Sequence, residues 1–366
     1  MKRILKWSAA AVLLLVVLGV LALFVAYWRS ASGCERLAAA EGERMKAIIY
    51  CDYGSPDVLE LAEIPKPVPG DNQVLVRVRA ASVNPYDSHF LRGEPFLMRI
   101  DFGLRKPKSP RIGVDFAGTV EAVGAKVTEF RPGDEVFGGK SGAFAEYVVA
   151  AETALARKPQ NLTIEETAAV NMGGTTALQG LRDNGELQPG QKVLINGASG
   201  GVGTFAVQIA KAMGAEVTGV SSTKNVELVR SLGADHAVDY TKEDFTTGTT
   251  RYDLILDMVG NRSLSENRRV LTPNGKYVMV GGPKGRWLAP MDRALRAEVL
   301  SWFVSQEIGM MLAQYSRDDL NHLRDLIEAG KVKPMIDRRY PLHEVPEAIR
   351  YLETGRARGK VVITVP

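Results

Sequence analysis

A glycine-rich loop is the clearest chemical feature of the chain. The segment Gly197-Ala198-Ser199-Gly200-Gly201-Val202-Gly203 follows a short apolar run, Lys192–Asn196, and precedes a stretch with helical apolar spacing at 204–213. Glycines allow a tight turn and let backbone N–H groups approach a pyrophosphate, while the helix behind them presents its positive end to the anion. Ala198 replaces the first glycine of the usual G-x-G-x-x-G pattern, so the strand–loop–helix setting carries the interpretation. The loop residues that we assign to cofactor binding are Gly200, Gly201 and Val202.

The end of the next expected strand, 216–220, selects the cofactor. An NAD site carries an acidic side chain about 20 residues after the loop, where it binds the ribose hydroxyls. Here the strand is followed by Ser221-Ser222-Thr223-Lys224-Asn225. Lys224 can pair with a 2′-phosphate and the Ser222 hydroxyl can donate to it, so we expect NADP(H). A solvated surface lysine is the alternative interpretation of Lys224.

Two kinds of segment must position these residues. Between 166 and 282, strands alternate with helical patterns, which predicts a parallel sheet. Ligands bind at the carboxyl ends of such strands, so Val259 and Gly281, each just after an expected strand, join the predicted cofactor site. Residues 45–165 instead show closely spaced short strands and turns, which favour a barrel-like domain.

Charge and cysteine content exclude other functions. The chain has 366 residues, 46 basic and 42 acidic side chains, and a formal net charge of +4. Six basic and three acidic residues lie in 1–44, so the rest carries a net charge of only +1. A nearly neutral body offers no basic face, and nucleic acid is not an expected partner. Two cysteines exclude a disulfide scaffold and a zinc site built mainly from thiolates.

Residues 7–28 form an uncharged apolar run with aromatic rings at both ends. As a helix it would be about 33 Å long, close to the hydrocarbon thickness of a bilayer. We therefore expect residues 1–28 to be a single transmembrane anchor in contact with the lipid bilayer, followed by a linker at 29–44. A cleaved signal peptide and a start at Met45 are the alternatives. The basic cluster before the run slightly favours an orientation with the main domain outside the cytoplasm. The nucleotide pool that the cofactor site requires favours the opposite orientation, so the orientation stays open, and we expect a membrane protein with its catalytic domain on the cytoplasmic side.

Five further motifs complete the pattern: Ser82-Val83-Asn84-Pro85-Tyr86-Asp87, Gly113-Val114-Asp115-Phe116-Ala117-Gly118, Pro132-Gly133-Asp134, Gly233-Ala234-Asp235 and Gly359-Lys360-Val361-Val362. With the glycine loop, they make the chain from Met45 to Pro366 resemble the medium-chain dehydrogenase/reductase superfamily, in its zinc-independent quinone oxidoreductase-like branch. The resemblance implies an α/β fold, with a Rossmann-type parallel-sheet domain at 166–304. A discontinuous GroES-like β-barrel substrate domain is expected at 45–165 and 305–366, with the active site in the cleft between the domains.

The resemblance also indicates whether the chain should bind a catalytic zinc ion. Zinc-containing relatives have a cysteine where Ser82–Asn84 lies and Gly-His-Glu where Gly113-Val114-Asp115 lies. Both the thiolate and the imidazole are missing here, and the only cysteines are Cys34 and Cys51. Zinc prefers sulfur and imidazole ligands, so we expect no metal.

Without a Lewis acid, a simple ketone is hard to polarise, whereas a conjugated carbonyl spreads the incoming charge. We therefore expect hydride transfer from NADPH to a quinone or another α,β-unsaturated carbonyl. Two alternatives stay open: a general NAD(P)-dependent alcohol or aldehyde dehydrogenase, and a non-catalytic NADPH-binding membrane or partner protein.

The resemblance assigns the remaining site residues. Asn84 is expected in the active-site cleft, and His89 stands where relatives often carry a tyrosine, so His89 or Tyr86 is the candidate proton donor. A structural histidine is the alternative. Further cofactor contacts are expected from Thr176, near the nicotinamide, from Tyr240, near the adenosine phosphate, and from Lys360, facing the cleft. The apolar stretch 287–315 is interpreted as a pocket wall, a lid, a subunit contact in a homodimer, or a second membrane contact.

Overall fold

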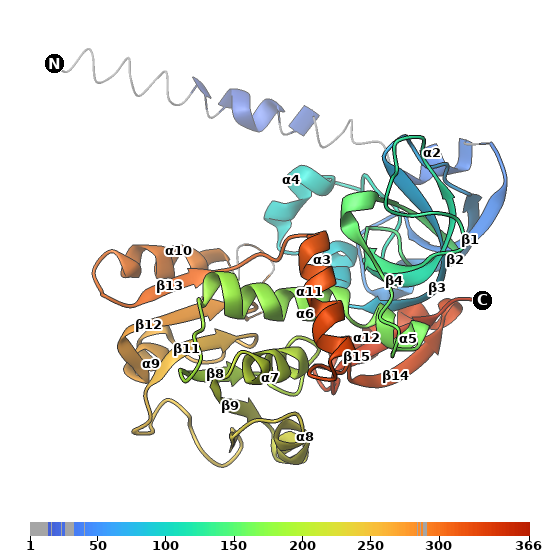
Figure 1. The fold of residues 1–366 in the computed structure, drawn as a ribbon. Helices are drawn as coiled ribbons and strands as arrows, with labels where there is room; N and C mark the ends of the chain where they lie inside the picture. Colours follow the sequence, from blue (N-terminus) through green and yellow to red (C-terminus); the bar gives the residue numbers. More distant parts are fainter. Residues whose placement is uncertain are drawn as a thin grey trace.

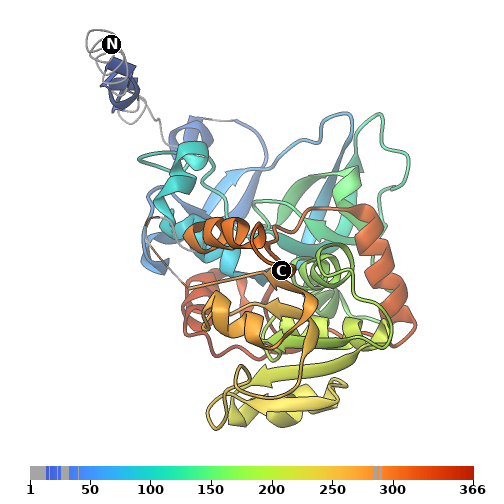
Figure 2. The same ribbon diagram turned by 90° about the vertical axis from the view of Figure 1, so that its left-hand side faces the viewer.

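The computed structural model describes residues 14–15, 17–22, 24–25, 33–39, 41–283, 285, 287 and 291–366. The body of the molecule consists of two lobes, one built on a parallel sheet and one on antiparallel strands (Figure 1). In the view turned by 90°, the yellow and orange strands of the parallel sheet lie below the blue and green strands of the other lobe (Figure 2). Both lobes were expected from the spacing of apolar residues.

The parallel sheet has six strands in the order β10-β9-β8-β11-β12-β13. The strands are β8 (Lys192–Asn196), β9 (Glu216–Ser221), β10 (His236–Asp239), β11 (Tyr252–Asp257), β12 (Leu271–Met279) and β13 (Glu307–Met310). All five pairings are parallel. The chain order reverses between β8 and β11, and ligands bind outside the carboxyl ends of strands at such a reversal.

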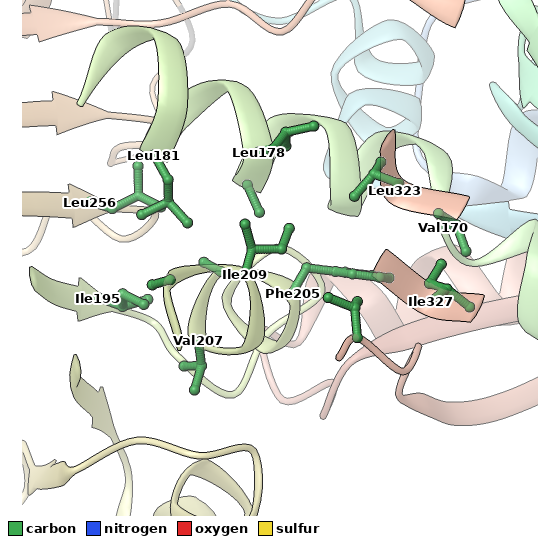
Figure 3. Close-up of a cluster of buried hydrophobic side chains, with 14 of the residues drawn as sticks. Val170, Leu178, Leu181, Ile195, Phe205, Val207, Ile209, Leu256, Leu323 and Ile327 are labelled. Atoms are coloured by element: carbon green, nitrogen blue, oxygen red, sulfur yellow. The ribbon is translucent and has the colours of Figure 1, made fainter. Parts of the chain in front are cut away.

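Alternate residues of the central strands enter two separate cores. Val193 and Ile195 of β8 pack with Phe205 and Ile209 in one core, which also receives Leu323 (Figure 3). Leu194, between them, faces the second core. Strands buried on both faces are expected to be continuously apolar, as Val193-Leu194-Ile195 is. The helices of this lobe are α6 (Asn171–Gln179), α7 (Gly203–Ala212), α8 (Val226–Ser231), α9 (Leu264–Arg269), α10 (Met291–Ser301) and α11 (Arg317–Glu328), whereas α5 (Ile164–Ala168) packs against the strands of the other lobe.

The antiparallel lobe contains both early and late parts of the chain. Its main sheet runs β14-β15-β3-β4-β5-β7, and β6 also pairs with β3. Its strands are β3 (Gln73–Val83), β4 (Asp115–Val123), β5 (Glu135–Gly139), β6 (Tyr147–Ala151), β7 (Leu155–Arg157), β14 (Ile336–Pro341) and β15 (Lys360–Thr364). A separate hairpin joins β1 (Arg44–Tyr50) to β2 (Leu59–Pro65), and the helices are α2 (Gly33–Ala39), α3 (Pro85–Arg92), α4 (Arg99–Phe102) and α12 (Val345–Glu353). Because β15 pairs with β3, the last part of the chain lies in the same sheet as its early part.

The predicted transmembrane anchor is contradicted. No helix among the residues that the structure describes is long and apolar enough to cross a bilayer. Within the apolar run 7–28, the described helical residues fall between Leu14 and Val25. The rest of the run lies outside the described residues. The predicted single-pass anchor and membrane localisation are wrong, and the predicted bilayer contact is not shown.

A disulfide bond joins Cys34 of α2 to Cys51, just after β1, with their Cα atoms 5.7 Å apart. Composition correctly excludes a disulfide scaffold, but it gave no reason to pair these two cysteines. The bond ties α2 to the antiparallel lobe, where the Gly33 amide also donates to the Pro107 carbonyl (3.2 Å).

Replacing Phe205 by alanine is expected to lower the free energy of unfolding by about 3–5 kcal/mol, because the ring fills the core between α7 and its neighbours. Phe205 is 1% exposed, whereas Phe303 is 78% exposed. Phe303→Ala is therefore the matched control and should change stability by about 0.5 kcal/mol or less. Urea denaturation of both variants measures the difference, and equal losses would show that the packing described is wrong.

Candidate active site

The glycine loop joins the end of β8 to the start of α7. Gly203 is packed so closely that a Cβ atom on it would lie 2.1 Å from the Gly197 carbonyl oxygen, so no other residue fits there. The amide of Val202 makes no hydrogen bond to any other residue that the structure describes, whereas Gly201 is held beside Gly359 by the parallel bridge at Gly200. They precede the first turn of α7, where unpaired N–H groups and the helix dipole attract anions. The loop thus fits a pyrophosphate.

The parallel sheet brings most of the predicted cofactor residues to one edge, because the carboxyl ends of its strands meet there. Ser222 and Lys224 follow β9, Tyr240 follows β10, Val259 follows β11 and Gly281 follows β12. Thr176 is buried in α6. That helix packs on the glycine loop, since a Cβ atom on Gly173 would lie 2.7 Å from the Gly201 carbonyl oxygen. Thr176 is three residues from Gly173 and so shares its face of the helix.

The residues after β9 fit a 2′-phosphate. Lys224 is exposed and makes no ion pair with a described residue, so its charge is available to a ligand. One carboxylate that sequence reasoning overlooked, Asp239, lies next to Ser221 in the sheet register. Hydrogen bonds from Thr223 (2.6 Å) and Thr241 (2.7 Å) hold the pKa of Asp239 at about 2. Both oxygens of the Asp239 carboxylate therefore already accept hydrogen bonds from these threonines.

Asp115 is the centre of a buried polar cluster that joins the two lobes. Its side chain is fully buried and accepts five hydrogen bonds. One donor is the ammonium group of Lys360, which also donates to the Asn84 side-chain oxygen. The five donors are Ser82 Oγ (2.9 Å), Asn84 Nδ2 (3.0 Å) and Lys360 Nζ (3.1 Å) on Oδ2, and Asn171 Nδ2 (2.9 Å) and the Met172 amide (3.1 Å) on Oδ1. A buried carboxylate needs such a set of donors to remain charged.

Lys360 places this cluster against the glycine loop. A Cβ atom on Gly201 would lie 3.2 Å from Lys360 Cδ, so the lysine stem runs along the loop. The preceding residue, Gly359, donates its amide to the Ser199 carbonyl (3.0 Å) and forms a parallel bridge with Gly200. Sequence reasoning placed Lys360 in the site but missed the central role of Asp115. The sequence did contain a signal for Asp115, because it is the one charged residue in the otherwise apolar segment Gly113–Gly118.

Asn84 begins α3, and its backbone amide donates to Asp87 (2.7 Å). Burial raises the pKa of Asp87 to about 7, and the nearby charge of Asp115 adds to the effect, which the Asn84 hydrogen bond opposes. Tyr86 is more exposed than Asp87, and its ring stacks on that of Phe90, with ring centroids 4.2 Å apart. Burial, and then the charge of Asp87, raise the pKa of the Tyr86 phenol, so it stays protonated at neutral pH.

His89 is separated from this cluster. Residues two apart on a helix point about 200° apart, so His89 and Asp87 lie on opposite faces of α3. The His89 ring is instead fixed by a hydrogen bond between Nδ1 and the Glu94 carbonyl (3.0 Å). It lines a small hollow with Tyr53 and Arg99. The structure therefore brings together Asn84 and Lys360 but not His89.

The position corresponding to the catalytic zinc site of relatives does not fit a metal ion. Asp115 is the one carboxylate of Gly113-Val114-Asp115, and both of its oxygens already accept hydrogen bonds. The ammonium of Lys360, 3.1 Å from Asp115, would repel a dication. Ser82 and Asn84 are also poor zinc ligands.

Comparison with known proteins agrees with this architecture. Residues 70–160 match the family described as alcohol dehydrogenase GroES-like domain, and residues 232–363 match the family described as zinc-binding dehydrogenase. The chain is 37% identical to the 2-methylene-furan-3-one reductase of Solanum lycopersicum over 334 residues, which are 87% of this chain and 79% of the relative. It is 31% identical to the quinone oxidoreductase of Homo sapiens, over 88% of this chain and 99% of the relative.

A solved structure shows the same fold. The quinone oxidoreductase from Coxiella burnetii superposes with a TM-score of 0.79 at 32% identity, and the match covers 88% of this chain and 100% of that protein. Because the match covers 88% of this chain, the similarity extends over both lobes. The chain therefore belongs to the medium-chain dehydrogenase/reductase superfamily, in its quinone oxidoreductase-like branch.

Proposed function

We propose that the protein is a metal-free, NADPH-dependent reductase of quinones or other α,β-unsaturated carbonyls. The observation that carries the proposal is the position of Lys360, whose stem lies on the glycine loop while its ammonium joins Asn84 and Asp115. A cation therefore stands where other members of the superfamily hold a metal. Relatives named quinone oxidoreductase and NADPH-dependent alkenal/one oxidoreductase support the same substrate class.

The cofactor NADP(H) supplies a hydride when bound, held by the glycine loop and by Ser222 and Lys224. Thr176, Tyr240, Val259 and Gly281 complete the proposed cofactor site. The protein itself must stabilise the negative charge that develops on the substrate oxygen. Lys360 has three N–H donors, and Asn84 and Asp115 take two of them. We assign the third to the substrate oxygen.

Asn84 and Asp115 are positioning residues in this proposal. The Asn84 side chain donates to Asp115 (3.0 Å) and to the Ser82 carbonyl (3.2 Å), and it accepts from Lys360. With all of these bonds made, it fixes the lysine rather than touching the substrate. Tyr86, exposed at the start of α3, forms a wall of the substrate site.

A substrate panel tests the function. NADPH oxidation, followed by absorbance, is expected with quinones and enones and not with saturated aldehydes, whose carbonyls need stronger polarisation. Turnover of alcohols with NADP⁺ would instead favour the alcohol dehydrogenase alternative. NADPH binding without turnover of any acceptor would favour the non-catalytic one. The homodimer remains a prediction, which sedimentation equilibrium checks.

Lys224→Ala is expected to weaken NADPH binding at least tenfold and to leave NADH binding nearly unchanged, because only NADPH carries the 2′-phosphate that the lysine pairs with. Lys126→Ala is the control, since Lys126 is an exposed lysine in the antiparallel lobe. Fluorescence titration with both nucleotides measures the affinities. Equal losses for NADPH and NADH would reject the assignment.

Lys360→Met keeps the stem on Gly201 but removes the ammonium, and turnover is expected to fall about 100-fold, as when one donor to a developing oxyanion is lost. The variant also leaves Asp115 charged and buried without its cation, which can destabilise the fold. The double variant Lys360→Met with Asp115→Asn removes the unpaired carboxylate, so the effect of losing the ammonium on turnover can be measured without that destabilisation. Wild-type turnover in a folded Lys360→Met protein would show that the lysine is not needed.

A further inference from the structure

The proposed reduction leaves one proton unassigned. When a hydride adds to a conjugated carbonyl, the electron pair of the C=O bond moves onto oxygen, which must then be protonated. His89, the donor expected from its position in the sequence, is bonded to the Glu94 carbonyl on the far side of α3. The remaining candidates are Tyr86, on the same lobe as Asn84, and any other hydroxyl that lies near the Asp115 cluster.

Tyr315 lies beside that cluster, although it comes from the other lobe, between β13 and α11. Its ring covers Gly139, which stands opposite Asp115 in the pairing of β4 with β5. A Cβ atom on Gly139 would lie 2.2 Å from Tyr315 Cε1 and 2.5 Å from Asn171 Nδ2. The same Asn171 nitrogen donates to Asp115 (2.9 Å). The tyrosine ring and the cluster therefore share one small patch of the sheet.

The backbone on both sides of Tyr315 is held in place. Gln179 accepts from the Gln314 amide and donates to the Gln314 carbonyl, both at 2.9 Å. On the other side, Ser316 caps α11 by accepting from the Asp319 amide (3.2 Å). A residue fixed in this way loses little conformational entropy when it binds a ligand.

The Tyr315 hydroxyl is available for donation. It makes no hydrogen bond to another residue in the described part of the chain, and half of the residue is exposed to solvent. Burial of the ring, followed by the charge of Asp115 and the neighbouring Tyr86 and Asp87, raises the pKa of the phenol. The hydroxyl therefore remains protonated across the physiological range.

We infer that Tyr315 is the catalytic proton donor to the substrate oxygen, acting from the lobe opposite to Asn84 and Tyr86. The inference rests on the proposed function. As the hydride reaches the β-carbon, the tyrosine O–H bond breaks and an O–H bond forms on the substrate oxygen, giving an enol; for a quinone this enol is a tautomer of the hydroquinone and converts to it by moving a proton from ring carbon to the second oxygen. Water at the exposed side of the ring returns the proton to the tyrosinate. Lys360 stabilises the oxygen while its charge develops.

Tyr315→Phe tests the inference, because it removes the hydroxyl and keeps the ring on Gly139. Turnover of a quinone or enone is expected to fall about 100-fold, the usual contribution of a general acid, with unchanged affinity for NADPH. Tyr147→Phe, in the antiparallel lobe, is the control and should keep wild-type turnover. Tyr86→Phe is the rival variant: loss of turnover there, with wild-type turnover in Tyr315→Phe, would overturn the assignment.

Binding of 4-nitrophenolate gives a readout that does not need turnover. Its oxyanion mimics the reduced substrate, and its absorption spectrum shifts when a donor binds the oxygen. Tyr315→Phe is expected to weaken this binding about tenfold and to remove the spectral shift, as for a lost hydrogen bond to a charged group. Unchanged affinity and spectrum would overturn the role of Tyr315. If these effects are seen in a protein that reduces no quinone or enone, the donor is supported and only the proposed substrate class fails.

Discussion

The buried ion pair between Lys360 and Asp115 is the interaction on which the arrangement of the site depends. Asp115 is fully buried and Lys360 is 3% exposed, so neither charge is compensated by water. An isolated buried charge is costly, and the pair is tolerated because every oxygen of the carboxylate is hydrogen-bonded. The donors come from β3, α6 and β15, so the requirement to neutralise one carboxylate brings both lobes together.

In the proposed mechanism, the ion pair also accounts for catalysis without zinc. A metal ion would provide a positive charge at the substrate oxygen, and the proposal gives that task to Lys360. Its position is set by two contacts that differ in kind: the ammonium is fixed by Asn84 and Asp115, and the stem rests on Gly201. The Gly359–Ser199 hydrogen bond then keeps the first residue of β15 against the glycine loop. A substrate oxygen near Lys360 is therefore also near the cofactor-binding loop.

The sequence predicted the parts of the site that local patterns encode. A strand, a glycine loop and a helix are contiguous, so the loop and the residues after each parallel strand could be placed from periodicity alone. Asp115 and Tyr315 could not, because their importance arises from contacts between distant segments. His89 was favoured by its position in a motif, but the helix turns it away from the cluster.

The apolar run 7–28 predicted a membrane helix, and composition gave no reason to pair Cys34 with Cys51. The wrong anchor prediction and the unforeseen disulfide both concern segments outside the repeating pattern of the two lobes. Hydropathy measures only the length of an apolar run, and the described residues of this run include no helix long and apolar enough to cross a bilayer. A cysteine pair, in turn, is recognised only when the chain path brings two Cα atoms within bonding range.

The order of residues in the cluster has a consequence for synthesis on the ribosome. Asn84 and Asp115 precede Lys360 by 276 and 245 residues. The strands that bury Asp115 are therefore made long before its counter-ion, and domains tend to fold in the order of their synthesis. Until β15 emerges, the carboxylate must stay hydrated or protonated. The antiparallel lobe can thus reach its final packing only after the whole parallel-sheet lobe has been translated, so it must wait in a partly open form.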